Sequence, residues 1–197
     1  MADLKIFAKT IEPEAIAQVE LLLAQEAFKD CKIRIMPDTH VGKGCVIGFT
    51  ADLGDKVIPN IVGVDIGCGM LTVGLGKQQI DFEKLDKLIR KFVPSGRHIH
   101  NKKLASFPKI LDLNCYSVLK RKERFERSIG TLGGGNHFIE IDRDDSGNMY
   151  LIIHTGSRNL GKQVADYYQN LAIKILKDKD TSIPRDLCYL TGKYRDM

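Results

Sequence analysis

A carboxylate and a thiol stand three residues apart in a glycine-rich stretch, a pairing that can hold a metal ion. Asp65 and Cys68 lie in the segment 62–70, which reads Val-Gly-Val-Asp-Ile-Gly-Cys-Gly-Met. The two side chains can face one point only if the backbone turns tightly between them, and the flanking glycines permit such a turn. A hard oxygen ligand beside a soft sulfur ligand suits manganese, iron or zinc. A buried turn that carries a structural cysteine explains the same residues without a metal.

Three of the five histidines, His40, His137 and His154, lie beside predicted turns or strand ends in glycine-rich surroundings. Taken singly, each is also explained as a structural residue that hydrogen-bonds its neighbours. His137 follows three glycines, and His154 ends an apolar stretch that reads as the next strand. If these two strands pair as a hairpin, His137 and His154 come within reach of a shared ion. The predicted set mixes oxygen, sulfur and nitrogen ligands: Asp65, Cys68, His137 and His154.

Two further stretches have features that suit phosphate. The glycines 133–135 precede Asn136, so backbone N–H groups there can approach an anion. This is not a P-loop, because no Gly-Lys-Ser/Thr follows and a strand comes next. Ser157 and Arg158 stand where a helix is predicted to begin, and a helix dipole and a guanidinium both suit phosphate. A capped helix with a surface arginine explains the second stretch equally well.

The basic residues of 97–103 and 116–129 have a plain interpretation as a solvated connector and a solvated helix face.

Hydrophobic periodicity predicts a mixture of helices and strands. Helices are expected at 13–28, 81–92 and 116–129 and from Leu160 onward. Strands are expected at 31–36, 46–50, 70–75, 136–142 and 149–154, with a turn at 37–40. No stretch has the composition of a linker, so the sequence predicts a single α+β domain over 1–197.

The composition is that of an ordinary soluble globular protein, with 43% hydrophobic and 28% charged residues among 197. No apolar run is long enough to cross a bilayer, and the first residues lack the pattern of a signal peptide. Five cysteines without a Cys-x-x-Cys pair favour reduced thiols in a cytoplasmic protein and argue against a zinc ribbon. The net charge of +5 permits a polyanionic partner without requiring one.

Four stretches resemble, in order, the signature blocks of the RtcB family of RNA-splicing ligases. They read MPDTHVGKG at 36–44, VGVDIGCGM at 62–70, GTLGGGNHFIE at 130–140 and HTGSRNLG at 154–161. The resemblance implies an RtcB-like α+β fold in which a curved mixed sheet with glycine-rich loops is flanked by helices. It also implies a manganese- and GTP-dependent enzyme. Such an enzyme joins an RNA 3′-phosphate or 2′,3′-cyclic phosphate end to a 5′-hydroxyl end, in tRNA splicing or RNA repair.

The resemblance assigns roles to particular residues. It implies the same four metal ligands, Asp65, Cys68, His137 and His154. It also implies a guanylate-binding segment formed by Asn136, His137, Phe138, Ile139 and Glu140. Contacts with the RNA backbone are expected from Arg158, Lys120 and Arg121, whose positive charges suit phosphate.

Family chains continue well beyond the point that corresponds to residue 197. By the resemblance, that later part holds a further ligand histidine, much of the guanine pocket and the histidine that becomes guanylylated. No histidine follows His154 in this sequence. We therefore expect the N-terminal, metal-binding portion of such a ligase, with an incomplete fold, no catalytic nucleophile of its own and a need for a C-terminal half. The alternative is a degenerate, non-catalytic module that retains metal or RNA binding.

Overall fold

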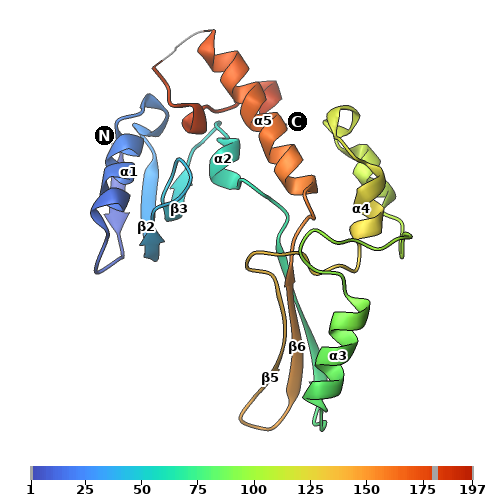
Figure 1. The fold of residues 1–197 in the computed structure, drawn as a ribbon. Coiled ribbons are helices and arrows are strands. Elements are labelled where there is room, and N and C mark those ends of the chain that lie inside the picture. The colour runs from blue at the N-terminus through green and yellow to red at the C-terminus, as the bar shows by residue number, and fades with distance from the viewer. Residues whose placement is uncertain (1, 179–181, 197) are drawn as a thin grey trace. The chain divides into compact units, whose positions relative to one another are not determined.

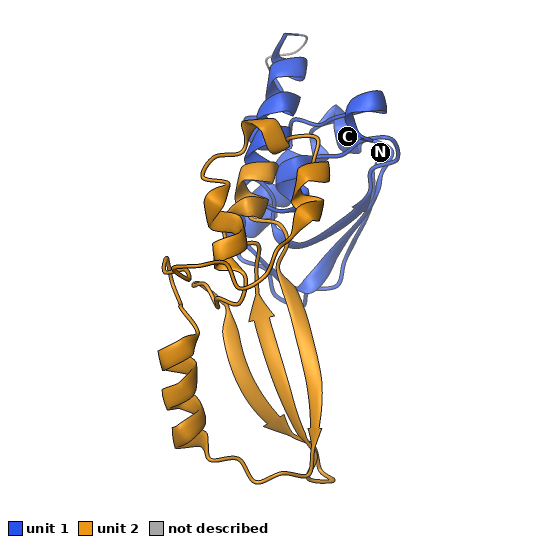
Figure 2. Ribbon diagram, turned by 90° about the vertical axis from the view of Figure 1, so that its right-hand side faces the viewer, with its two compact units in different colours: residues 1–64, 165–197 blue, residues 65–164 orange. Residues whose placement is uncertain are grey.

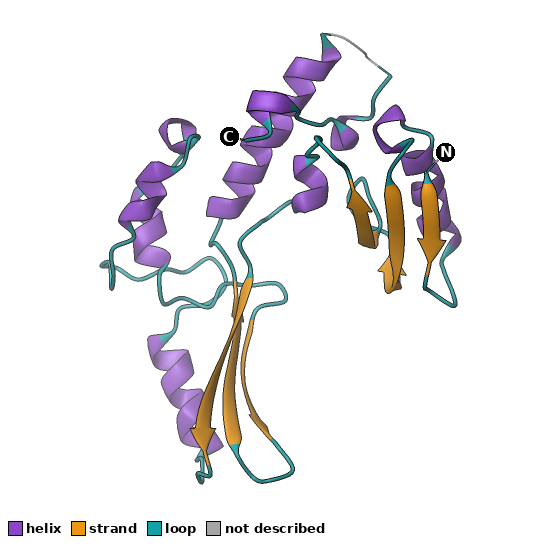
Figure 3. Cartoon of the chain, turned by 180° about the vertical axis from the view of Figure 1, so that it is seen from behind, coloured by secondary structure: helices purple, strands orange, loops and turns teal. Residues whose placement is uncertain are grey.

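The strands lie in two separate three-stranded sheets, with helices beside them (Figure 3). The computed structural model describes residues 2–178 and 182–196, and it confirms the predicted α+β class. The chain divides into two compact units, residues 1–64 with 165–197 and residues 65–164 (Figure 2). A single domain over 1–197 stays a prediction.

The first unit contains a mixed sheet in the order β1-β2-β3 (Figure 1). Its strands are β1 (Asp3–Ile6), β2 (Lys32–His40) and β3 (Ile47–Asp52). Strand β1 pairs in parallel with β2, and β3 pairs with β2 antiparallel. Sequence periodicity does not reveal β1, because four residues at the edge of a sheet show too short a pattern. The helices of this unit are α1 (Pro13–Leu23) and α2 (Pro59–Val62), with 3₁₀ turns at Glu26–Phe28, Arg185–Leu187 and Gly192–Tyr194.

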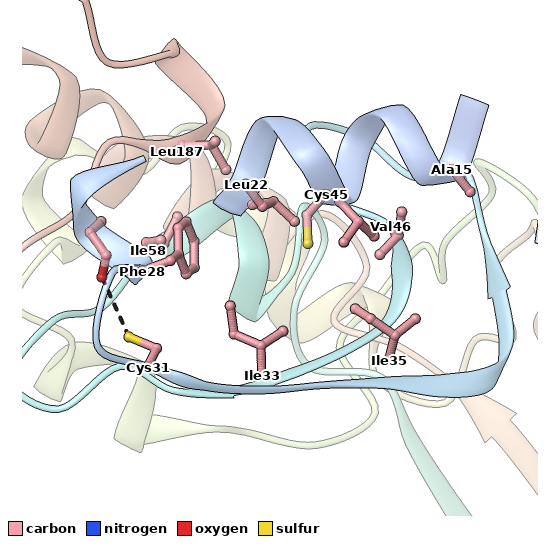
Figure 4. Packing of buried hydrophobic residues seen from close by; sticks show 12 residues of the cluster. Ala15, Leu22, Phe28, Cys31, Ile33, Ile35, Cys45, Val46, Ile58 and Leu187 are labelled. Atoms are coloured by element: carbon pink, nitrogen blue, oxygen red, sulfur yellow. Dashed lines mark hydrogen bonds between the residues drawn. The ribbon is translucent and has the colours of Figure 1, made fainter. Parts of the chain in front are cut away.

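Alternation along β2 builds the core of this unit. Ile33 and Ile35 are almost fully buried, and both point from the strand toward α1 (Figure 4). Leu22 from α1 and Phe28 from the following 3₁₀ turn meet them. Period-2 burial on the strand and helical spacing on α1 therefore close one hydrophobic layer, as the sequence pattern predicts.

The turn predicted at 37–40 is wrong, because β2 continues through these residues to His40. The pairing with β3 is regular from Lys32 to Ile35 and resumes only at His40 opposite Ile47. Pro37 has no N–H to donate to a ladder, and proline in a sheet is tolerated at such irregularities. The proline thus marks a bulge within a strand, where the sequence pattern indicated its end.

The second unit contains an antiparallel sheet in the order β4-β6-β5. Its strands are β4 (Gly69–Gly76), β5 (Phe138–Arg143) and β6 (Met149–Thr155). The predicted hairpin of β5 and β6 is confirmed. Its helices are α3 (Phe82–Phe92) and α4 (Glu123–Ser128), with a 3₁₀ turn at Pro108–Asp112, and α5 (Leu160–Lys177) begins in this unit. None of the helices within the described ranges is long and apolar enough to cross a membrane.

The helix predicted over 116–129 is broken. The structure has a 3₁₀ turn at Tyr116–Val118 and a short α4, separated by Arg121 with a left-handed φ of 53°. The Gln163 side chain accepts a hydrogen bond from the Lys120 N–H (2.7 Å) and donates one to the Lys120 carbonyl (3.2 Å). These backbone groups of Lys120 are therefore satisfied from outside the segment, so that the helix does not continue through it.

Two adjacent leucines of α1 test the position of the hydrophobic core in the first unit. Leu22 is 1% exposed, whereas Leu21 is 48% exposed on the same helix. Leu22→Ala leaves a cavity and is expected to lower the free energy of unfolding by about 2–5 kcal/mol. Leu21→Ala is expected to change it by about 0.5 kcal/mol or less. Urea denaturation followed by circular dichroism measures both, and equal losses would contradict the assignment of Leu22 to the core.

Candidate metal centre

Three potential ligands meet at one edge of the β4-β6-β5 sheet. Cys68 directly precedes β4, His137 directly precedes β5, and His154 is the last residue but one of β6. Because β6 runs antiparallel to both neighbours, its end lies beside the starts of β4 and β5. One ligand atom from each of the three residues lies within 4.8 Å of the other two. We call Cys68, His137 and His154 the ligand cluster.

The ligand cluster is tightly arranged. The Cys68 Sγ lies 3.7 Å from the Nε2 of His137. The rings of His137 and His154 meet edge to face, with centroids 5.5 Å apart. The centroids of the Phe138 and His154 rings are also 5.5 Å apart, as expected for residues directly opposite each other on β5 and β6. Cys68 is exposed and both histidines are half-buried, so the cluster is open to solvent on the thiol side.

The residues present fit a metal ion. The Nδ1 atoms of His137 and His154 are buried, and neither has a hydrogen-bond partner among the residues that the structure describes. A buried polar nitrogen without a hydrogen-bond partner destabilises the folded protein. A bound metal ion, or a hydrogen-bonding group that accompanies the ion, would offset this cost. One thiol and two imidazoles are the donors that intermediate transition metals prefer.

Gly156 keeps the ligand cluster free of other side chains. A Cβ at this position would lie 2.9 Å from the Cys68 Sγ and 2.9 Å from the His137 Nε2. The backbone of the loop after β6 therefore passes against the ligand atoms, at a distance that only glycine allows.

Two residues of the sequence prediction lie outside the ligand cluster. Asp65 is exposed, and its Oδ1 accepts a hydrogen bond of 3.2 Å from the Ser157 hydroxyl. His40 belongs to the other unit, where its Nδ1 lies 2.8 Å from the carbonyl oxygen of Asp38. The ligand role of Asp65, Cys68, His137 and His154 stays a prediction, and the structure brings the last three together.

The segment expected to bind guanylate divides between a loop and a strand. Asn136 is exposed at the end of the glycine loop. Phe138 and Glu140 project to the face of the sheet that carries His154, whereas Ile139 projects to the opposite face. Side chains of 136–140 therefore do not all face one nucleotide, and any contact from Ile139 to a ligand at His154 would come from its backbone.

Arg158 holds two loops together. Its Nε donates to the Thr131 hydroxyl at 3.0 Å, and one terminal nitrogen donates to the carbonyl oxygens of Gly96 (2.6 Å) and His98 (3.5 Å). Burial lowers the pKa of Arg158 below its ordinary value, and the positive charge of Arg124 adds to this effect. Several of its donors are thus used within the protein.

A cleft of about 380 Å³ lies beside Arg158. Four arginines line it, and they define the arginine cleft: Arg97, Arg121, Arg124 and Arg158. Asp65 also lines it, so that it adjoins the loop that leads to Cys68. The sequence predicts phosphate contacts from Arg121 and Arg158. It does not single out Arg97 and Arg124, because their local spacing is that of a solvated surface.

The cysteines separate into one exposed thiol and four buried ones. Burial raises the pKa of Cys45 to about 12, and it also raises the pKa of Cys31, Cys115 and Cys188. Only thiolates react quickly with alkylating agents. Burial therefore protects these four cysteines in two ways: it blocks the reagent, and it keeps the thiol protonated.

Iodoacetamide at pH 8 is therefore expected to modify Cys68 in the native protein, with one thiol labelled per chain. Mass spectrometry of the digested protein identifies the site. The variant Cys68→Ala should show almost no labelling, while denatured protein should show all five thiols modified. Rapid labelling of Cys45 in the native protein would contradict its burial.

Comparison with known proteins places the chain in a family. The family model for "tRNA-splicing ligase RtcB" matches residues 22–121 and 114–197. The chain is 32% identical to the RNA-splicing ligase RtcB of Escherichia coli K12, over 95% of this chain and 52% of the relative. It is 26% identical to the tRNA-splicing ligase RtcB of Archaeoglobus fulgidus, over 88% of this chain and 47% of the relative. The chain thus spans about half the length of these relatives, and it belongs to the RtcB family.

Proposed function

We propose that this chain is the metal-binding part of a GTP- and manganese-dependent RNA ligase. The reaction is the joining of RNA 3′-phosphate or 2′,3′-cyclic phosphate ends to 5′-hydroxyl ends. The ligand cluster is the observation that carries the proposal, because it brings a thiol and two imidazoles within 4.8 Å in a chain of this family. Relatives named RNA-splicing and tRNA-splicing ligases support the RNA substrate.

In this proposal, Cys68, His137 and His154 hold a manganese ion, with Asp65 as a fourth, oxygen ligand. Bound manganese would supply stabilisation of the negative charge that develops on phosphoryl oxygens. The protein holds the donor atoms in place. Cys68 stands directly before β4, His137 directly before β5 and His154 near the end of β6, which pairs with both. Asn136 orients phosphate, and the segment 136–140 contributes to GTP binding.

The arginine cleft is the proposed contact for RNA phosphates. Arg97, Arg121 and Arg124 add positive charge around a cavity that Asp65 also lines. Arginine suits phosphate because its planar donors can bind two oxygens at once. Arg158 serves this surface mainly by holding the loops at Gly96 and Thr131, since its donors bond there. Lys120 contributes charge nearby, with its backbone fixed by Gln163.

We further propose that covalent guanylylation requires a second polypeptide segment. This segment corresponds to the half of the relatives' sequence that this chain does not match. The 197 residues contain no histidine after His154 to serve as the guanylylated nucleophile. The competing proposal is a non-catalytic module that keeps metal or RNA binding. The two differ in whether a polypeptide that carries the other half restores ligation.

Removal of the thiol tests the metal site. Cys68→Ala is expected to weaken manganese binding several-fold or more, by analogy with the cost of disturbing ligand surroundings. Gly69→Ala is the matched control, because a Cβ at Gly69 meets nothing within 4 Å. Isothermal titration calorimetry measures both affinities. Unchanged binding by Cys68→Ala would remove Cys68 from the ligand set.

A guanylylation assay tests whether the histidine nucleophile is absent from this chain. The 197-residue polypeptide, incubated with labelled GTP and manganese, is expected to form no covalent guanylate adduct, because it lacks the nucleophile. The full-length Escherichia coli relative serves as the positive control. An adduct on this chain would contradict the assignment of the nucleophile to the other half. Ligation restored by a polypeptide carrying that half would exclude the non-catalytic module.

A further inference from the structure

We propose that Ser157 is a positioning residue that holds the Asp65 carboxylate for metal binding. The proposal rests on the proposed function, because it concerns the fourth ligand of the same site. Among the residues that the structure describes, Ser157 is the hydrogen-bond partner of the Asp65 side chain, with 3.2 Å between Oγ and Oδ1. Within the described parts of the chain, the Asp65 Oδ2 atom accepts no hydrogen bond, so it remains able to bind an ion.

The hydrogen bond joins the two segments that carry metal-binding residues. Asp65 stands three residues before Cys68, and Ser157 stands three residues after His154. An exposed aspartate samples several rotamers, and ordering it at the moment of binding costs entropy. A hydroxyl that already holds one carboxylate oxygen removes part of this cost. Partners of this kind orient metal ligands in many proteins.

The Ser157 hydroxyl is itself held in place. It accepts a hydrogen bond of 2.7 Å from the Gly161 N–H in the first turn of α5. Its one proton is thereby directed away from the helix and toward Asp65. The side chain is shared between a helix cap and a carboxylate, so its orientation follows from the start of the helix.

Close backbone packing keeps the two segments together. A Cβ at Gly161 would collide with the carbonyl oxygen of Ile66, and a Cβ at Gly67 would lie 3.2 Å from the Cβ of Ser157. The start of α5 therefore lies directly on the residues that follow Asp65. The approach at Gly161 requires glycine because a Cβ has no room there, and the φ of 91° at Gly67 also favours glycine.

The loop between Ser157 and α5 has an uncommon backbone conformation. Arg158 (φ 56°) and Asn159 (φ 80°) are both left-handed, although neither is glycine. Two such residues in succession cost free energy and occur where the surrounding structure requires them. Here they turn the chain so that the Ser157 hydroxyl faces back to Asp65 while α5 begins three residues later.

Manganese titration of the 197-residue chain by calorimetry tests the proposal. Ser157→Ala is expected to weaken binding about 10-fold, the size typical for the loss of a ligand's hydrogen-bond partner. Ser157→Thr keeps the hydroxyl and the helix cap, and it should restore most of the affinity. Ser106→Ala is the matched control: Ser106 also donates to a carboxylate, Glu126, at 2.7 Å, and its loss should leave manganese affinity unchanged.

A double-mutant cycle separates positioning from helix capping. If Ser157 acts through the carboxylate, Ser157→Ala should cause no further loss of affinity in an Asp65→Ala background. The same loss in both backgrounds would assign Ser157 a capping role only and would overturn the proposal. If the wild-type chain binds manganese and Ser157→Ala binds it equally or more tightly, the role of Ser157 is overturned. The proposed function would stand in that case. Absence of manganese binding by the wild-type chain would contradict both.

Discussion

The pairing of β6 with both of its neighbours is the constraint on which the candidate site depends. Since β6 runs opposite to β4 and β5, its last residues lie beside the first residues of both. The register sets His154 opposite Met70 and Phe138, with Cys68 two residues before Met70 and His137 one residue before Phe138. A slip of one residue would turn the His154 side chain to the other face of the sheet. Register therefore defines the ligand cluster.

Glycines bring the backbone close to the side chains at this edge of the sheet. Gly156 lies against the ligand atoms, and Gly161 lies against the carbonyl of Ile66. A Cβ at Gly133 would lie 2.5 Å from the His137 Nδ1 and would collide with the Arg158 guanidinium. These contacts leave space in which the donors face one another. Arg158 then ties the loops at Gly96 and Thr131 with charged hydrogen bonds.

Charge is distributed to match the proposed chemistry. The ligand cluster has one exposed thiol and two half-buried imidazoles, which suit a cation. The arginine cleft beside Asp65 concentrates positive charge, which suits phosphate. Asp65 stands between these two surroundings, of which one suits a cation and the other an anion. Burial lowers the pKa of Arg158, and the negative charge of the Asp65 carboxylate raises it by a smaller amount. In the proposed function, this carboxylate connects the metal site with the arginine cleft that Asp65 lines.

The sequence alone determined the local elements and the chemistry of the candidate ligands. Periodicity predicted α1, α3 and the β5–β6 hairpin. The glycine-rich blocks predicted the candidate ligands Asp65, Cys68, His137 and His154. Tertiary structure decided what depends on distant contacts. It bonded Asp65 to Ser157 and brought Arg97 and Arg124 into one cleft. It also interrupted a predicted helix at Lys120, whose backbone N–H donates to the Gln163 side chain. Periodicity and spacing report neighbours along the chain, whereas these contacts join residues 43 to 92 positions apart in two of the three cases.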